Sequence, residues 1–252
     1  MTRHWQLGAV LAESGAEETV LRHLGSPAAL HVVGGRLRAG AGYAAAPREA
    51  RRELARTGAI LRLRTRGAYV LHASGAVAPN GSAWILTGDS GSGKSTLAFA
   101  LARHGWRVLG DDGVVIRIDN TGRSMAFGWR DPLRMSCSLF PVFPELVPLE
   151  PLVDERDPRR RVPVNAPFAA GAPVAGCVFL ERGEHDGATR LAETEVMAKL
   201  IAQSPWVLIP DAHARDHFDA LRQFAVGVPC WRLMNTERQL HHISATLEGL
   251  LS

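Results

Sequence analysis

Apolar and polar positions near the start of the chain fall into short β-prone runs that predict a hairpin. Gly34 and Gly35 lie between two such runs, and a glycine pair suits the two-residue turn of a hairpin. The segment 46–67 is rich in helix-favouring Ala, Arg, Glu and Leu. Pro47 suits the first turn of a helix, and Gly67 suits the position just past its end. These elements predict a small N-terminal lobe, or an extension of a sheet, over residues 1–66.

The following segment alternates apolar runs with turn residues and helical patterns. Residues 69–78 and 82–88 read as strands joined by a Pro-Asn-Gly-Ser turn. Residues 94–105 carry apolar side chains at helical spacing, and 106–119 predict two strands around an acidic pair. These elements follow one another in the order strand, loop, helix, strand and acidic pair. This order is typical of an α/β nucleotide-binding domain, which we expect over residues 67–252.

The rest of the chain is less regular. Frequent prolines over residues 123–173 predict a long excursion with short strands, and excursions of this kind are often functional. Residues 174–183 return to the pattern of a buried strand. The remaining expected elements are helices near 192–203, 211–225 and 236–250 and a short strand over 230–234.

Composition narrows the class of protein. The 252 residues are 46% hydrophobic and 21% charged, which is typical of a globular chain. No apolar run is long enough to cross a bilayer and the first residues lack a signal-peptide pattern, so we expect a cytoplasmic protein without a membrane partner. The net charge of +4 favours anionic partners, but no aromatic-basic pattern indicates nucleic acid. Three separated cysteines predict buried or half-buried thiols rather than a disulfide or zinc site.

The segment Gly88–Ser95, GDSGSGKS, satisfies the phosphate-binding pattern G-x-x-x-x-G-K-[ST]. Its glycines let backbone N–H groups converge on phosphate oxygens, and the helix that follows adds its positive end. Lys94 is expected to reach the terminal phosphates and the Ser95 hydroxyl to ligate Mg²⁺. A chance match in a glycine-rich loop is the alternative. The expected nucleotide-binding residues are Gly88, Asp89, Ser90, Gly91, Ser92, Gly93, Lys94, Ser95 and Thr96.

Two further features of the sequence supply candidate catalytic groups near the loop. Asp111 and Asp112 follow a short strand expected to run parallel to the strand that feeds the loop, so both carboxylates would lie at the same sheet edge. One carboxylate can hold Mg²⁺ and the other can take a proton from a hydroxyl, unless the pair is only a solvated turn. His72 lies in the strand before the Pro-Asn-Gly-Ser turn. It is either a core residue or, if that strand pairs beside the loop strand, a neighbour of the phosphates.

Together the segments LHASGAV, GDSGSGKST and LGDD resemble the catalytic domain of HPr kinase/phosphorylase. That family consists of serine-protein kinases with a P-loop, related in fold to phosphoenolpyruvate carboxykinase. The resemblance implies an α/β P-loop kinase domain that uses ATP and Mg²⁺. It implies phosphate and Mg²⁺ roles for Lys94 and Ser95, a proton-accepting role for Asp112, and a catalytic role for His72. Asp111 is then the carboxylate of the acidic pair that we expect to hold the metal.

The sequence also departs from this family. Thr96 stands where the family has Glu, and the family's later Arg-Gly-x-Gly signature is only distantly echoed by LERGEHDG. Arg182 in that segment is a candidate for the catalytic arginine. HPr as the acceptor and phosphorolysis are therefore not expected. The chain looks more similar to compact HPr-kinase-like proteins of gene clusters for ribosomal peptides, including lasso peptides, which implies a precursor-peptide serine as the acceptor.

The sequence therefore predicts an ATP- and Mg²⁺-dependent kinase acting on a serine hydroxyl of a peptide or small protein. The alternatives are a kinase for a sugar or metabolite alcohol, and a nucleotide-binding regulator without productive transfer. We expect ATP rather than GTP as the nucleotide, because ATP is the more commonly used of the two. The sequence is also compatible with a homo-oligomer. A run of arginines would grip an acidic acceptor or cap the phosphates, unless it is a solvated loop. It comprises Arg156, Arg159, Arg160 and Arg161.

Overall fold

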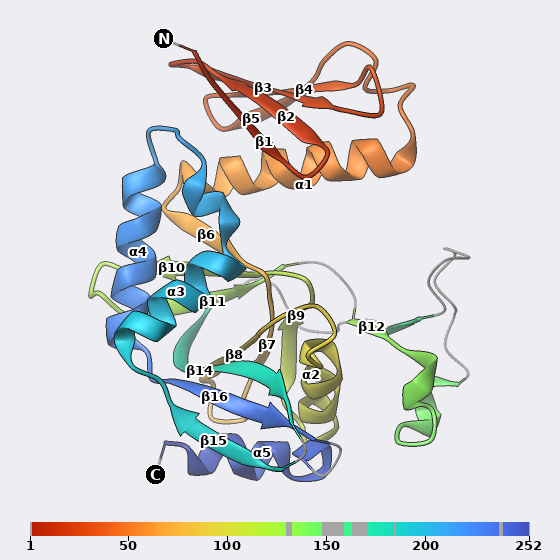
Figure 1. The fold of residues 1–252 in the computed structure, drawn as a ribbon, viewed down its shortest axis with the longest axis vertical. Coiled ribbons are helices and arrows are strands. Elements are labelled where there is room, and N and C mark those ends of the chain that lie inside the picture. The colour runs from red at the N-terminus through yellow and green to blue at the C-terminus, as the bar shows by residue number, and fades with distance from the viewer. Residues whose placement is uncertain are drawn as a thin grey trace. The chain divides into compact units, whose positions relative to one another are not determined.

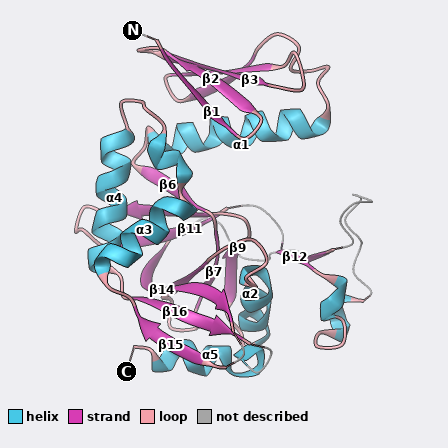
Figure 2. Ribbon diagram, in the orientation of Figure 1, coloured by secondary structure: helices cyan, strands magenta, loops and turns pink. Residues whose placement is uncertain are grey.

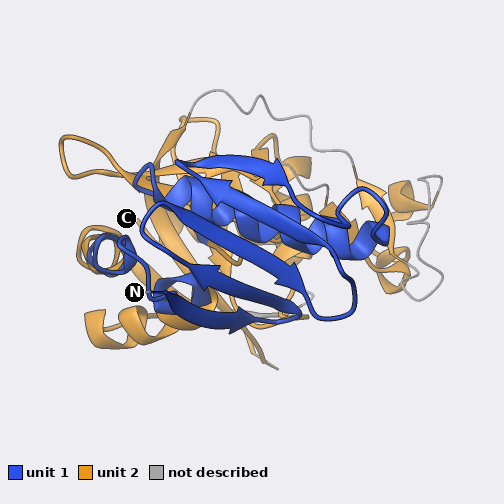
Figure 3. Cartoon of the chain, turned by 90° about the horizontal axis from the view of Figure 1, so that it is seen from above, with its two compact units in different colours: residues 1–70, 204–220 blue, residues 71–203, 221–252 orange. Residues whose placement is uncertain are grey.

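The computed structural model forms two compact units, residues 1–70 with 204–220 and residues 71–203 with 221–252 (Figure 3). The sequence placed the boundary after residue 66, whereas the structure assigns 204–220 to the first unit as well. That second segment is far along the chain, so no local pattern indicated it. The residues that the structure describes are 2–129, 133–147, 159–162, 171–183, 185–236 and 239–251.

The first unit contains a five-stranded antiparallel sheet covered by one helix (Figures 1 and 2). The predicted glycine turn is confirmed, because Gly34 and Gly35 have φ of 51° and 70° and join paired strands. Leu21 of the sheet and Leu54 of the helix are fully buried in the core between them. The elements are β1 (Arg3–Leu7), β2 (Val10–Ser14), β3 (Glu18–His23), β4 (Ala29–Val33), β5 (Arg36–Ala39) and α1 (Arg48–Arg64).

The larger sheet has nine strands among the described residues, with the path β6-β10-β11-β14-β8-β7-β9 and with β15 and β16 beside β14, and all of its strands except β6 lie in the second unit. The central strand β14 runs parallel to both β8 and β16. The strands are β6 (Ala68–Leu71), β7 (Ala73–Val77), β8 (Ala83–Thr87), β9 (Arg107–Gly110), β10 (Val114–Ile118), β11 (Ser124–Gly128), β14 (Ala172–Arg182), β15 (Gly187–Arg190) and β16 (Cys230–Asn235).

One expected strand is wrong. Residues 69–78 were predicted as a single strand, but the chain bends at His72 and forms β6 and β7, which occupy different positions in the sheet. Strand β7 lies between β8 and β9 and is antiparallel to both. It follows that β8 and β9 run in the same direction, as predicted, although β7 separates them.

The expected helices are confirmed, and two of them cover a face of this sheet. Leu97 and Leu101 of α2 share a buried core with Ile243 and Leu247 of α5 and with Trp84 of β8. Parts of the 123–173 excursion lie outside the described residues. The remaining elements are α2 (Lys94–Arg103), α3 (Glu193–Gln203), α4 (Ala214–Gly227), α5 (Gln239–Gly249), β12 (Leu133–Met135), β13 (Arg160–Val162) and the 3₁₀ turns η1 (Cys137–Leu139), η2 (Pro144–Leu146) and η3 (Pro205–Leu208).

The cysteines follow the sequence prediction. Cys177 and Cys230 are buried thiols on the neighbouring strands β14 and β16, and Cys137 is a half-buried thiol; none of the three is part of a disulfide. Burial raises the pKa of Cys177 well above its ordinary value, so this thiol is protonated at neutral pH. Across the described residues, no helix is both long enough and apolar enough to span a membrane.

Candidate functional site

The loop Gly88–Ser95 leaves β8 and enters α2, as the phosphate-binding pattern predicts. Gly88 has φ of 142°, and a Cβ there would lie 2.5 Å from the carbonyl oxygen of Leu180 on β14. Gly91 and Gly93 have φ of 80° and 100°, values that residues with a side chain rarely adopt. The three glycines therefore allow the loop to curl tightly between the sheet and the helix.

Lys94 begins α2 and is turned into the loop, where it is 6% exposed. Its Nζ donates hydrogen bonds to the carbonyl oxygens of Gly88 at 2.8 Å and Asp89 at 2.9 Å. Burial lowers the pKa of Lys94, while the negative charges of Asp112, Asp111 and Asp89 act in the opposite direction. The ammonium is thus held at the loop, within electrostatic reach of the three aspartates.

Asp111 follows β9 and is 1% exposed. The Ser95 hydroxyl donates to both of its carboxylate oxygens at 2.8 Å, and the Ser74 hydroxyl donates to Oδ1 at 2.6 Å. The backbone N–H of Arg134 donates to Oδ2 at 3.2 Å. These contacts fix a buried carboxylate against the first turn of α2.

This hydroxyl and carboxylate are oxygen ligands of the kind that Mg²⁺ prefers. Among the described residues, no group of three or more His, Cys, Asp or Glu side chains could hold a metal ion. Mg²⁺ usually takes one or two protein ligands and completes its shell with water and substrate phosphates, so Ser95 and Asp111 fit this ion.

Asp112 lies next to Asp111 but in a different environment. It is the one described non-glycine residue with positive φ, at 55°, and its side chain is 29% exposed. The guanidinium of Arg134 lies 3.6 Å from its Oδ2. Among the carboxylates that act on Lys94, Asp112 has the largest effect on the pKa. The half-buried carboxylate of Asp112 is therefore within electrostatic reach of the loop lysine.

His72 lies in the bend before β7, and β7 pairs with the loop strand β8, which is the condition under which His72 was considered as a neighbour of the phosphates. Its catalytic role stays a prediction. The register pairs Ala73 with Thr87, the last residue of β8, so the bend lies at the edge from which the loop departs. The Thr87 hydroxyl donates to the carbonyl oxygen of His72 at 3.1 Å. The backbone of His72 thereby supports the start of the loop.

Arg182, at the end of β14, contacts the loop directly. Its Nε and Nη2 donate to the carbonyl oxygen of Gly91 at 3.0 and 2.8 Å. The side chain is exposed and sits beside the segment expected to hold phosphates. The contact agrees with its selection as a candidate, and the chemical role of Arg182 stays a prediction.

Two residues of the site were missed from the sequence. Ser74 offered a signal, because it is a polar residue in the otherwise apolar strand β7. No signal in the sequence indicated that Arg134 belongs to the site, because its contact with the aspartates depends on where β12 lies in the fold. Of the predicted arginine run, Arg156 lies outside the described residues, and Arg160 lies over the ring of Phe140 at 5.3 Å.

Comparisons with known proteins give a limited result. No protein-family model matches the chain, and no curated protein matches it. One matching solved structure is the Hpr(Ser) kinase/phosphatase from Coxiella burnetii, at 13% identity and a TM-score of 0.38. The match covers 72% of this chain and 94% of the other. At this TM-score the similarity supports no conclusion about activity. The observed fold is that of a mixed α/β protein in which the loop Gly88–Ser95 joins β8 to α2.

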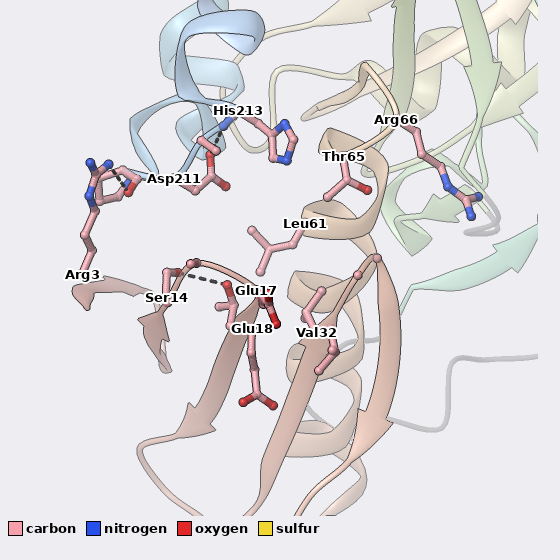
Figure 4. Close-up of a pocket in the computed structure, with 18 residues that line it drawn as sticks. Arg3, Ser14, Glu17, Glu18, Val32, Leu61, Thr65, Arg66, Asp211 and His213 are labelled. Carbon is pink, nitrogen blue, oxygen red and sulfur yellow. Dashed lines mark hydrogen bonds between the residues drawn. The ribbon is translucent and has the colours of Figure 1, made fainter. Parts of the chain in front are cut away.

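A separate pocket of about 920 Å³ lies within the first unit (Figure 4). Its walls come from the turn after β2, the turn after β4, the end of α1 and residues 210–213. Leu61 and Val32 supply apolar surface, and Asp211 and His213 supply polar groups. None of the predicted catalytic or nucleotide-binding residues lines it.

Proposed function

We propose that this chain is an ATP- and Mg²⁺-dependent kinase that transfers a phosphoryl group to a serine hydroxyl of a peptide or small protein. The observation that supports this most directly is that the two neighbouring aspartates have different environments. Asp111 is buried and bonded to Ser95, while Asp112 is part-exposed and acts electrostatically on Lys94. A metal-holding carboxylate and a separate proton acceptor are the two groups that transfer to a hydroxyl requires.

In this proposal Lys94 and the loop N–H groups bind the terminal phosphates of the nucleotide. Ser95 and Asp111 hold the Mg²⁺ ion, which supplies positive charge to the phosphoryl oxygens. Asp112 accepts the proton of the acceptor hydroxyl as the oxygen–phosphorus bond forms. The bond from phosphorus to the oxygen of the leaving diphosphate breaks in the same step, and the proton later passes from Asp112 to water.

The segments LHASGAV, GDSGSGKST and LGDD support a serine acceptor in a ribosomal precursor peptide, by their resemblance to the compact kinases of such gene clusters. A metabolite alcohol would use the same loop and aspartates. A short precursor-peptide gene next to peptidase and cyclase genes would favour the peptide.

Incubation with labelled ATP and Mg²⁺, against a panel of serine peptides and a panel of metabolite alcohols, tests the proposal. We expect label on peptides. Asp112→Asn should reduce transfer by at least about a hundredfold and leave nucleotide affinity nearly unchanged. Asparagine tolerates the positive φ of this position, so the variant keeps the backbone.

Lys94→Ala serves as the comparison and should abolish nucleotide binding. If Asp112→Asn left transfer at the wild-type rate, the proton-accepting role would be excluded. If no acceptor in either panel became labelled while nucleotide still bound, the chain would be a nucleotide-binding regulator.

A further inference from the structure

Two arginines on the short β12–β13 pair share one face. The strands are antiparallel, and the register places Arg134 directly opposite Arg161. Residues directly opposite each other in such a pair project from the same face. Leu133 and Met135, on either side of Arg134, are 1% and 0% exposed in the core of the second unit. Arg134 and Arg161 therefore project from the face away from that core.

This face meets the candidate site at Asp112. The guanidinium of Arg134 lies 3.6 Å from Oδ2 of Asp112, and its side chain is 19% exposed. The backbone N–H of Arg134 also contacts Asp111, so β12 is tied to both aspartates. Arg161 is exposed on the same face. The carboxylate of Asp112 balances the positive charge of Arg134. The positive charge of Arg161 lies at the surface, on the same face of the strand pair.

The arrangement suits an anionic ligand. Like charges directly opposite each other destabilise an antiparallel pair, and an anion on their shared face would offset this repulsion. Guanidinium groups present planar pairs of donors that match a carboxylate or a phosphate. A ligand held there would lie next to Asp112, the proposed proton acceptor.

We infer that Arg134 and Arg161 form an anion-binding subsite for the acceptor, and that the acceptor is an acidic peptide with a carboxylate side chain near the serine. This inference rests on the proposed function, because Asp112 gives the subsite its place in the reaction. Arg161 binds the peptide carboxylate. Arg134, held by Asp112, is a positioning residue that fixes the subsite relative to the reacting hydroxyl.

Arg160 provides a matched control on the same strand. It lies opposite Met135 in the register, and its guanidinium covers the ring of Phe140 at 5.3 Å. It therefore carries the same charge as Arg161 but projects from the other face. An effect of overall charge alone would be the same for Arg160→Gln and Arg161→Gln.

The test measures binding of labelled serine peptides with acidic or neutral flanks by fluorescence anisotropy, with Mg²⁺ and a non-hydrolysable ATP analogue present. The wild type should bind the acidic peptide about tenfold more tightly, the effect of about one charge-assisted contact. Arg161→Gln should lose this preference, and Arg160→Gln should keep it. The affinity for the ATP analogue should be the same in all three proteins.

Equal binding of acidic and neutral peptides by the wild type would overturn the inference. So would a loss of nucleotide affinity in Arg161→Gln without loss of peptide preference, because the arginines would then serve the nucleotide phosphates. Tighter binding of a phosphorylated metabolite alcohol than of the acidic peptide would also contradict it. Binding needs no turnover, so a peptide preference without phosphoryl transfer would refute the proposed function alone. Transfer to neutral and acidic peptides alike would refute the subsite alone.

Discussion

The hydroxyl of Ser95 donates hydrogen bonds to both carboxylate oxygens of Asp111, each at 2.8 Å. This contact joins the first turn of α2 to the end of β9, two elements on opposite sides of a turn in the chain. It brings together the two oxygen ligands that the proposed Mg²⁺ site requires.

Replacing Ser95 by alanine should weaken the binding of Mg²⁺ and leave the affinity for nucleotide in the absence of metal unchanged. The hydroxyl is one of two proposed protein ligands, so its loss should raise the Mg²⁺ concentration for half-maximal turnover about tenfold. Titration of Mg²⁺ at saturating ATP measures this. The control is Ser82→Ala, because the Ser82 hydroxyl bonds to Asn80 in the turn before β8. An unchanged Mg²⁺ requirement in Ser95→Ala would exclude this hydroxyl as a ligand.

Gly88→Ala should disrupt the loop. The added Cβ would lie 2.5 Å from the carbonyl oxygen of Leu180, and the φ of 142° disfavours any side chain. We expect the free energy of unfolding to fall by about 1–3 kcal/mol and nucleotide binding to be lost. Chemical denaturation and calorimetric titration measure the two effects. Gly227→Ala is the control, because no atom lies within 4 Å of its Cβ position. Wild-type nucleotide affinity in Gly88→Ala would show that the loop does not bind phosphate.

Nucleotide affinity should decrease at alkaline pH. Burial lowers the pKa of Lys94 from 10.5, so the ammonium loses its proton at a lower pH than an exposed lysine does. The protonated form attracts phosphate, and affinity therefore falls as the pH rises through this lowered pKa. Titrations between about pH 8 and 10 test this, since the nucleotide charge is constant there. Lys94→Arg should bind more weakly but without this pH dependence, because arginine stays charged. The same slope in both proteins would assign it to another group.

The first unit should lose stability in mild acid. His217 is fully buried, stacks on Tyr69 at 4.4 Å between ring centroids, and contacts the Ser204 hydroxyl at 3.1 Å. Burial, with a smaller effect from Arg64, lowers the pKa of His217 from 6.5 to about 3. Below pH 6.5 the unfolded chain binds a proton that the folded chain does not. Stability therefore falls with decreasing pH, by at most about 1.4 kcal/mol per unit.

Denaturant titrations between pH 6.5 and 5 measure this effect. His217→Gln cannot titrate and should show a shallower dependence over that range. If the variant and the wild type lost stability at the same rate, His217 would not be the group responsible.

Local sequence was sufficient for most elements and for the loop. The pattern of Gly88–Ser95 predicted a strand-loop-helix unit because its glycines and the helix start act within a few residues. The Gly34-Gly35 turn and the final helices were predicted for the same reason. The prediction of a single strand over residues 69–78 was wrong, because the apolar residues of this segment fit one strand or two. Only pairing with β10 and β8 decides that the chain bends at His72.

The sequence by itself determined which candidate groups this protein contains: a loop with the phosphate-binding pattern, an acidic pair and a histidine, each in a local pattern that its neighbours explain. The tertiary structure alone decided which groups meet. Ser74 and Arg134 reach Asp111 from β7 and β12, and the same fold leaves Asp112 accessible while Asp111 is buried. The physical reason is that burial and hydrogen bonding depend on sheet order and register, which join residues far apart in the chain.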